Sequence, residues 1–209
     1  MFQILSYDAF DAHGTLRAQM HLARSQQFCD RHKWKVTKTP DGLEVDQFDT
    51  PGTRYLVVSN AGGHAASLRL RAARDGNMVE QAFPALWAQH GQDLRTLPEV
   101  TRLCATPALS GLQRRLAVSR LLLGLCRHCR ADGHPTIFGL IFPSVGRTLT
   151  RAGWPPEIVA SQPHGNQTLL LARWTATAVV DWTLQETVAQ LADTQAEKLA
   201  SATGLRAVA

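Results

Sequence analysis

The order of expected elements along the chain predicts an α/β or α+β fold in which a mixed sheet is flanked by helices. Short runs rich in aliphatic and β-branched residues alternate with longer stretches of helical periodicity. The 209 residues are 44% hydrophobic and 19% charged, which is apolar enough for a packed interior and argues against disorder. No segment repeats, and we expect a single domain.

The N-terminal half is expected to fold as a strand, a long helix, a polar loop and a hairpin. The loop is rich in polar residues and contains Pro and Gly, which predicts an irregular segment covering a site. The sequence Ala-Gly-Gly between two β-rich runs is a hairpin signal. The expected elements are a strand at 2–7, a helix capped by Asp8 and running to about His32, a loop at 33–51, and strands at 53–60 and 64–73.

The C-terminal half alternates helices and strands. Pro98 inside a β-rich run suggests a bulge or an interrupted edge, and Gly153 followed by Trp-Pro-Pro ends a helix. The expected elements are a short helix at 84–90, a strand at 94–106, an amphipathic helix at about 112–131, a strand at 136–142, a helix at 145–153, a strand at 168–176, and a helix from Asp181 with a fraying tail after Ser201. We therefore divide the chain into a core at 1–180 and a C-terminal helix and tail at 181–209, which packs on the core or extends from it.

The four cysteines do not suggest a disulfide framework in a chain of this size. Cys126 and Cys129 form a C-x-x-C pair, but two further ligands at comparable spacing are missing, so no metal is expected. The N-terminus lacks the features of a signal peptide, and the longest apolar run is far shorter than the roughly 20 residues of a membrane span. We expect a soluble, cytoplasmic protein.

The formal net charge is +5, and the excess is concentrated in one region. Between residues 111 and 151 there are seven arginines and one acidic residue, Asp132. A basic face of this kind suits an acidic partner, although a solvated helix face would have the same composition. The tryptophans are scattered and no helix-turn-helix or zinc-finger spacing is present, which argues against nucleic acid.

A second pattern combines charged and aromatic residues over about 80 positions. Any one of these residues alone would be expected in a surface ion pair worth ~0–1 kcal/mol, so the argument depends on the whole ordered series. In order, the series consists of Arg24, Phe28, Trp34, Asp46, Asp49, Arg69, Glu99 and Arg102, with Arg54-Tyr55 completing the segment DQFDTPGTRY.

This series resembles the acyl-homoserine-lactone synthases, the LuxI-type autoinducer synthases of bacterial quorum sensing. Their pattern is an Arg and a Phe on the first helix, a Trp in the next loop, D-x-x-D-x-x-x-x-R-Y, an Arg on a strand, and E-x-x-R; this chain fills all eight places. The resemblance implies a GNAT-like twisted sheet. It also implies an acyltransferase that joins the amine of S-adenosylmethionine to an acyl group from a thioester, closes the lactone and releases methylthioadenosine. S-adenosylmethionine is then a substrate, and no cofactor is expected.

Such a substrate carries a sulfonium, an ammonium and a carboxylate. Carboxylates and aromatic faces suit the two cations, and arginines suit the carboxylate. We therefore expect S-adenosylmethionine to be bound by Arg24, Phe28, Trp34, Asp46, Asp49, Arg69 and Arg102. A carboxylate near the amine is the natural base, and Glu99 is the first choice with Asp46 as the alternative. The expected catalytic residues are Glu99, Asp46 and Arg102.

The acyl chain needs an apolar pocket, for which we select Leu103, Ile137, Phe138, Ile141, Phe142 and Trp154, although ordinary core is the default for each. In similar synthases that make 3-oxo products, a Thr lies on the strand that corresponds to 136–142. Here no hydroxyl follows until Ser144, so an unsubstituted or bulky apolar acyl group is favoured over a 3-oxo group.

The donor is expected to be an acyl-carrier protein or acyl-CoA. GNAT enzymes usually have a Gly-rich pyrophosphate loop, and the segment TPALSGLQRR lacks that form, which favours a carrier protein. Arg147 and Arg151 lie one helical turn apart and align with basic positions that similar synthases use to dock the carrier. Neither nucleic acid nor membrane is an expected partner.

Two other functions remain compatible with the residues. One is a GNAT-like N-acyltransferase that uses acyl-CoA and a different amine, which would not consume S-adenosylmethionine. The other is a non-enzymatic basic protein that binds nucleic acid or a carrier, with an affinity that falls steeply with salt.

Overall fold

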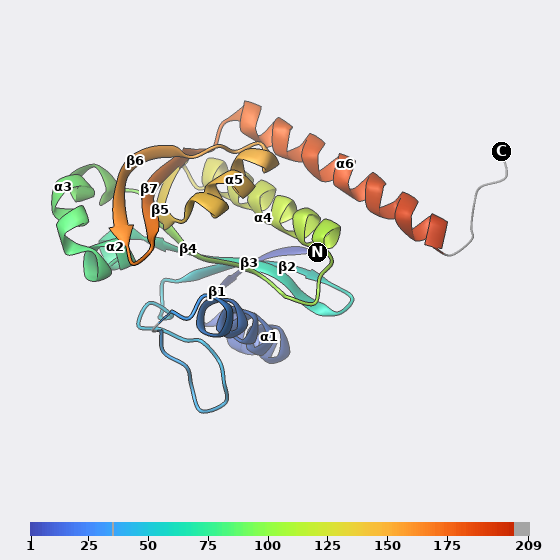
Figure 1. The fold of residues 1–209 in the computed structure, drawn as a ribbon, viewed down its shortest axis with the longest axis horizontal. Coiled ribbons are helices and arrows are strands. Elements are labelled where there is room, and N and C mark those ends of the chain that lie inside the picture. Colours follow the sequence, from blue (N-terminus) through green and yellow to red (C-terminus); the bar gives the residue numbers. More distant parts are fainter. Residues whose placement is uncertain (35, 203–209) are drawn as a thin grey trace.

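The computed structural model describes residues 1–34 and 36–202, and the tail predicted to fray lies outside them from residue 203 on. The described strands are β1 (Phe2–Ser6), β2 (Arg54–Asn60), β3 (Gly63–Ala72), β4 (Pro98–Ala105), β5 (Thr136–Ile141), β6 (Glu157–His164) and β7 (Gln167–Thr175). They form one mixed sheet in the order β1-β2-β3-β4-β5-β7-β6 (Figure 1). Together with the flanking helices, this sheet confirms the predicted fold class, a mixed sheet flanked by helices.

Helices cover both faces of the sheet. They are η1 (Ala9–His13), α1 (Gly14–Arg24), η2 (Ser25–Arg31), η3 (Ala73–Asp75), α2 (Met78–Ala82), α3 (Pro84–Leu94), α4 (Gly111–Ala131), α5 (Pro143–Ala152) and α6 (Ala178–Ala202). Helix α4 packs on one face in the main hydrophobic core, and α1 packs on the other face against β3 and β4 (Figure 1). None of the described helices combines the length and apolarity that crossing a membrane requires.

Alternation along β3 determines which side chains reach each face. Leu68 and Leu70 belong to the core under α4, whereas Arg69 and Arg71 point to the opposite face. All four side chains are buried. The face away from α4 therefore carries buried arginines, and the polar site is built there.

Strands β4 and β5 separate near the middle of the sheet. They are parallel, and the only described register pair between them is Glu99 with Phe138. On its other side β4 shifts register opposite Leu68, where Arg102 has a φ of 56°, a left-handed conformation that is uncommon outside glycine. The predicted irregularity in this strand therefore exists, but it lies at Arg102, and Pro98 instead begins the strand.

Several boundaries differ from the sequence predictions. The first helix is a continuous 3₁₀, α and π series, and the Asp8 side chain does not cap it; the Ser6 hydroxyl accepts the Ala9 N–H instead. Helix α2 and strand β6 were not predicted. The first has only five residues, and the second is an edge strand with mostly exposed side chains, so neither has a clear apolar period.

Helix α6 begins at Ala178, three residues before the predicted boundary at Asp181. Its buried side chains are Leu184 and Leu191, and its far end extends beyond the sheet (Figure 1). Asp181 accepts from Arg127 at 2.9 Å and from Arg130 at 2.7 Å, which ties α6 to α4.

Candidate active site

A cavity of about 1060 Å³ lies where β4 and β5 separate. Phe28 of η2 and Asp46 of the loop before β2 line it on one face of the sheet, while Leu122 and Leu125 of α4 line it on the other. Because its lining comes from both faces, the cavity passes through the sheet at the gap between the two strands. One end is polar and aromatic, and the other is apolar.

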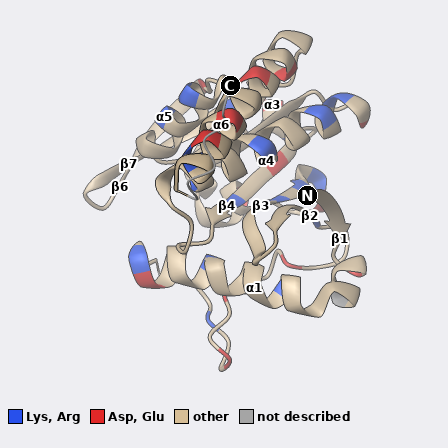
Figure 2. Ribbon diagram, turned by 90° about the vertical axis from the view of Figure 1, so that its right-hand side faces the viewer, with Lys and Arg blue, Asp and Glu red and all other residues tan. Residues whose placement is uncertain are grey.

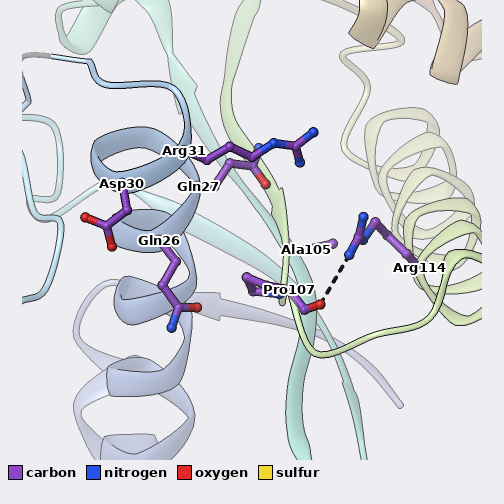
Figure 3. Close-up of a pocket in the computed structure, with 7 residues that line it drawn as sticks. All are labelled: Gln26, Gln27, Asp30, Arg31, Ala105, Pro107 and Arg114. Carbon is purple, nitrogen blue, oxygen red and sulfur yellow. Dashed lines mark hydrogen bonds between the residues drawn. The ribbon is translucent and has the colours of Figure 1, made fainter.

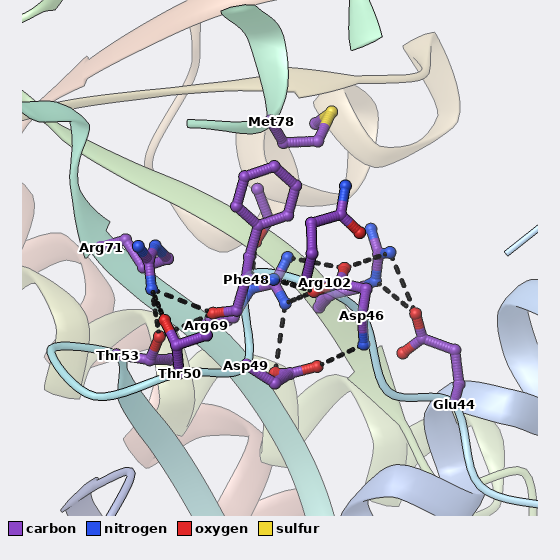
Figure 4. Close-up of polar contacts among 12 residues, drawn as sticks. Glu44, Asp46, Phe48, Asp49, Thr50, Thr53, Arg69, Arg71, Met78 and Arg102 are labelled. Carbon is purple, nitrogen blue, oxygen red and sulfur yellow. Dashed lines mark hydrogen bonds and ion pairs between the residues drawn. The ribbon is translucent and has the colours of Figure 1, made fainter. Parts of the chain in front are cut away.

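A buried ionic network forms the base of the polar end (Figure 4). It joins residues far apart in sequence through three arginines and three carboxylates, so its formal charges balance. Its members are Arg24, Arg69, Arg102, Glu44, Asp46 and Asp49.

Asp49 lies at the centre of this network and is 5% exposed. Arg24 donates to its two oxygens at 2.9 and 2.8 Å, and the Tyr55 hydroxyl donates at 2.8 Å. Burial alone would raise the pKa of Asp49, but the hydrogen bonds and charges of Arg24 and Arg69 outweigh it and hold the pKa well below its ordinary value. The carboxylate therefore stays ionised and fully occupied by the protein.

Asp46 joins the network to the cavity, since it lines the cavity and also receives two arginines. Arg69 binds it bidentately, and Arg102 donates to its Oδ2 at 2.6 Å. Burial raises its pKa, and the bonds and charges of Arg69 and Arg102 lower it further than burial raises it. Of the described groups that line the cavity, Asp46 is the only carboxylate.

The expected substrate ligands thus separate into two groups. Asp46, Arg102, Phe28 and Trp34 line the cavity. Arg24, Asp49 and Arg69 are not among its lining residues; both arginines are 1% exposed and bind carboxylates within the network.

Aromatic rings form the wall beside these charges. Phe28 and Trp34 stack with centroids 4.9 Å apart, and the Arg102 guanidinium lies 5.4 Å from the Phe28 centroid. The ring of Phe142, directly after β5, has its centroid 5.7 Å from that of Trp34. Phe48 also lines the cavity, with Arg69 5.4 Å from its centroid.

Glu99 does not occupy the position expected of a general base. It is 2% exposed, does not line the cavity, and accepts from the Met78 and Val79 N–H groups at 2.9 and 3.1 Å. Burial raises its pKa, and these two hydrogen bonds oppose that rise. Its carboxylate holds the start of α2. Arg102 instead binds Glu44 and Asp46, because its left-handed backbone interrupts the strand alternation and turns the side chain to the face that carries Arg69.

The apolar end contains most of the expected acyl-pocket residues. Leu103, Ile137, Ile141, Phe142 and Trp154 all line the cavity. Phe138 does not line it: adjacent strand residues face opposite sides of a sheet, and Phe138 packs with Leu171 and Trp87 in the cluster under α3.

A smaller cavity of about 350 Å³ lies between η2 and the start of α4 and shares Gln27 and Arg31 with the larger one (Figure 3). The Gln27 amide donates to the Leu103 carbonyl at 3.1 Å, beside the irregularity in β4. Arg114 donates to the carbonyls of Pro107 and Leu109 at 3.3 and 3.2 Å.

The basic region is partly neutralised by the fold. Arg127 and Arg130 are paired with Asp181. Arg147 and Arg151, the expected docking residues, are exposed on α5. Neither forms an ion pair within the described part of the chain. Figure 2 shows basic positions in blue beside the α5 label.

The sequence did not point to four residues that shape the site. Glu44 bridges Arg24 and Arg102, and Phe48 and Met78 line the cavity. Arg71 binds the acidic loop, which we define as residues 44–53. The one available signal was Phe48, an aromatic residue between two acids in an otherwise polar segment.

Comparison with known proteins identifies the same family as the resemblance in the sequence. A sequence profile described as "Autoinducer synthase" matches residues 10–179. The chain is 31% identical over 157 residues to an acyl-homoserine-lactone synthase of Rhizobium radiobacter, covering 72% of this chain and 74% of that one. It is 29% identical over 195 residues to one of Rhizobium etli, covering 91% and 92%.

Solved structures share the fold. The CoA-dependent acyl-homoserine lactone synthase MesI superposes with a TM-score of 0.76 at 16% identity, covering 90% of this chain and 95% of that one. The synthase LasI gives 0.71 at 21% identity, with coverages of 88% and 93%. With its profile match over most of the sequence, the chain belongs to the autoinducer synthase family.

Proposed function

We propose that this protein is an acyl-homoserine-lactone synthase that transfers an acyl group from a thioester to the amine of S-adenosylmethionine. The observation that carries this proposal is the cavity through the sheet, which places a charged aromatic end and an apolar end on opposite sides of the β4–β5 gap. A structure of the related synthase BjaI contains S-adenosylmethionine and isopentyl-CoA. The charged end suits the cationic S-adenosylmethionine, and the apolar end suits the acyl chain of the thioester.

In this proposal, the charged end binds S-adenosylmethionine. Asp46 pairs with the ammonium, and Arg102 pairs with the carboxylate. Phe28, Trp34 and Phe48 offer aromatic faces to the sulfonium and the adenine. The buried residues Arg24, Arg69 and Asp49 act indirectly. They fix the orientation of Asp46, which binds the substrate.

The reaction needs a neutral amine. An α-ammonium group has an ordinary pKa of roughly 7.7–8.0, so the base has only a modest task near neutral pH. We assign it to Asp46, directly or through water, because Asp46 lines the cavity, whereas Glu99 is 2% exposed and does not line it.

The amine nitrogen attacks the thioester carbonyl, the amide bond forms, and the donor thiol leaves. A methionine carboxylate oxygen then attacks its own Cγ, and the Cγ–sulfur bond breaks. The products are an acyl-homoserine lactone and methylthioadenosine. Arg102 orients the attacking carboxylate in this second step.

The acyl chain occupies the apolar end, against Ile137, Ile141, Trp154 and neighbouring side chains. The donor is an acyl-carrier protein or acyl-CoA. For a carrier, Arg147 and Arg151 on α5 provide the basic docking surface. The four free cysteines fit a reducing compartment, and we place the reaction in the cytoplasm.

Purified protein incubated with S-adenosylmethionine and acyl thioesters of several lengths tests the proposal. Mass spectrometry should detect an acyl-homoserine lactone and an equal amount of methylthioadenosine. Acylation of another amine with S-adenosylmethionine left intact would instead identify an N-acyltransferase of different specificity.

A further inference from the structure

We infer that Arg71 is a positioning residue for the S-adenosylmethionine end of the cavity, and that it acts by holding Phe48 in the wall. The inference rests on the proposed function for the identity of the substrate. The contacts themselves belong to the fold and are independent of it.

Arg71 makes four hydrogen bonds from a buried position on β3, where it is 7% exposed. Its Nη1 donates to the Phe48 carbonyl at 3.1 Å, to the Thr50 hydroxyl at 2.8 Å and to the Thr53 hydroxyl at 2.7 Å (Figure 4). Its Nη2 donates to the Asp75 carbonyl at 2.7 Å. One guanidinium therefore fastens the second half of the acidic loop to the sheet.

The electrostatic setting of Arg71 differs from that of the other buried arginines. Arg24, Arg69 and Arg102 each bind carboxylates, whereas the described partners of Arg71 are all neutral oxygens. Its cross-strand neighbour is Glu99, whose oxygens bind the start of α2. Burying a cation without a direct ion pair is costly, and an apolar side chain would pack there more cheaply. A costly local choice of this kind marks a position with a functional task.

That task is carried out through Phe48. The Phe48 N–H donates to Asp46 at 2.8 Å and its carbonyl accepts from Arg71, so the residue is held from both sides. Its ring lines the cavity and has Arg69 and Arg71 at 5.4 and 6.0 Å from its centroid. An aromatic face fixed in this way can receive the sulfonium cation, and losing its anchor would let it turn away.

Steady-state kinetics separate this role from a general structural one. The variants are Arg71→Met, Arg71→Lys, Phe48→Leu, the double variant Arg71→Met/Phe48→Leu, and Arg74→Met as a matched control. Arg74 lies three residues away on η3 and is exposed, with its side chain 80% accessible. The KM for each substrate and kcat are measured for all of them, together with thermal unfolding.

Arg71→Met should raise the KM for S-adenosylmethionine about tenfold, the effect of losing one cation–π contact, with the KM for the acyl donor nearly unchanged. Arg71→Lys should restore part of the loss, because a lysine keeps the charge but not the fork of donors. The double variant should be no worse than Phe48→Leu, since both changes remove the same contact. Arg74→Met should match the wild type.

Equal increases in both KM values, additive effects in the double variant, or identical behaviour of Arg71→Met and Arg74→Met would each overturn the inference. Should Arg71→Met fail to fold, Arg71→Lys and Thr50→Val provide milder tests of the same anchor. Hydrogen exchange over residues 44–53 needs no substrate and should be faster in Arg71→Met. Unchanged exchange overturns the anchoring role whatever the activity, whereas a wild type that makes no lactone overturns only the proposed function.

Discussion

At the scale of single residues, the buried carboxylates are bound by other groups of the protein itself. Asp49 receives Arg24, Tyr55 and the Asp46 N–H, and its side chain is 1% exposed. Charges taken out of water in this way are tolerated only because each has its partner. The network therefore sets the direction of Asp46 and contributes to the integrity of the fold.

Asp49→Asn tests this directly. Removing one charge leaves Arg24 buried without its full complement, so the free energy of unfolding should fall by about 3–5 kcal/mol. Asp30→Asn is the control, because the Asp30–Lys38 pair, at 3.3 Å, is exposed and should contribute less than about 1 kcal/mol. Urea titration of both variants measures the difference; equal losses would show that the network adds no special stability.

Asp46→Asn and Glu99→Gln distinguish the two candidate bases. Asp46→Asn should lower kcat by about 100-fold or more, because it removes the carboxylate that lines the cavity. Glu99→Gln keeps one acceptor oxygen for α2 and should retain more activity, with the acidic limb of its pH–rate profile still present. Loss of that limb in Glu99→Gln would reassign the base to Glu99.

At the scale of elements, helix α5 has two surfaces that can be tested separately. One surface packs on α6, and the other carries basic side chains. Helix α5 ends at Ala152 and is followed by Gly153, which has a φ of 100° and lies against Thr183 of α6. Its outer surface carries Arg147 and Arg151. The same short helix thus packs on α6 and presents basic side chains to solvent.

Gly153→Ala should destabilise the protein by about 2–4 kcal/mol, since a Cβ would add left-handed strain and a clash with Thr183. Gly133→Ala separates the two causes. Its φ is 74° and no atom lies within 4 Å of the added Cβ, so it should lose only the strain, about 1–2 kcal/mol. Thermal unfolding measures the loss of stability in both variants. Similar losses would show that the contact with Thr183 does not add to the effect of Gly153→Ala.

Charge reversal of both Arg147 and Arg151 should raise the KM for an acyl-carrier donor and weaken its dependence on salt. The KM for an acyl-CoA donor of the same chain length should change little, because CoA is small and does not need a broad basic face. Reversal of Arg74 and Arg95, which are exposed elsewhere, serves as the control. Equal losses with both donors would contradict a docking role.

At the scale of the whole molecule, buried histidines make the free energy of unfolding depend on pH. His64 is 5% exposed, contacts the Ser67 hydroxyl at 2.9 Å through Nε2, and has no partner at Nδ1 in the described structure. Burial lowers its pKa to about 4. Burial, aided by Arg24, also lowers the pKa of His21.

The unfolded chain takes up a proton on His64 near pH 6.5, but the folded protein does not until about pH 4. Stability is therefore fully present above pH 6.5 and falls as pH drops toward 4, by about 3 kcal/mol for this residue. His64→Gln should flatten this part of the stability–pH curve, while His13→Gln at an exposed position should not. Urea titrations between pH 4 and 7 measure the slopes, and parallel curves for wild type and His64→Gln would refute the assignment.

The sequence by itself determined the fold class, most elements and the membership of the charged series. Periodicity identifies helices and strands because it reflects one buried face in each element. The spacing from Arg24 to Arg102 identified the family because eight residue types recur in order. Elements with no clear period, such as α2 and β6, were missed for the same physical reason.

Only the tertiary structure decided what each residue faces. The ion pairs of the network join residues between 20 and 58 positions apart, so their mutual neutralisation cannot be read from local spacing. The left-handed backbone at Arg102 interrupts the strand alternation and turns this side chain to the face that carries Arg69. Regular alternation in β5 places Phe138 away from Ile137. A sequence pattern specifies which residues are present, whereas burial and pairing depend on where distant segments meet, and that is settled by packing in three dimensions.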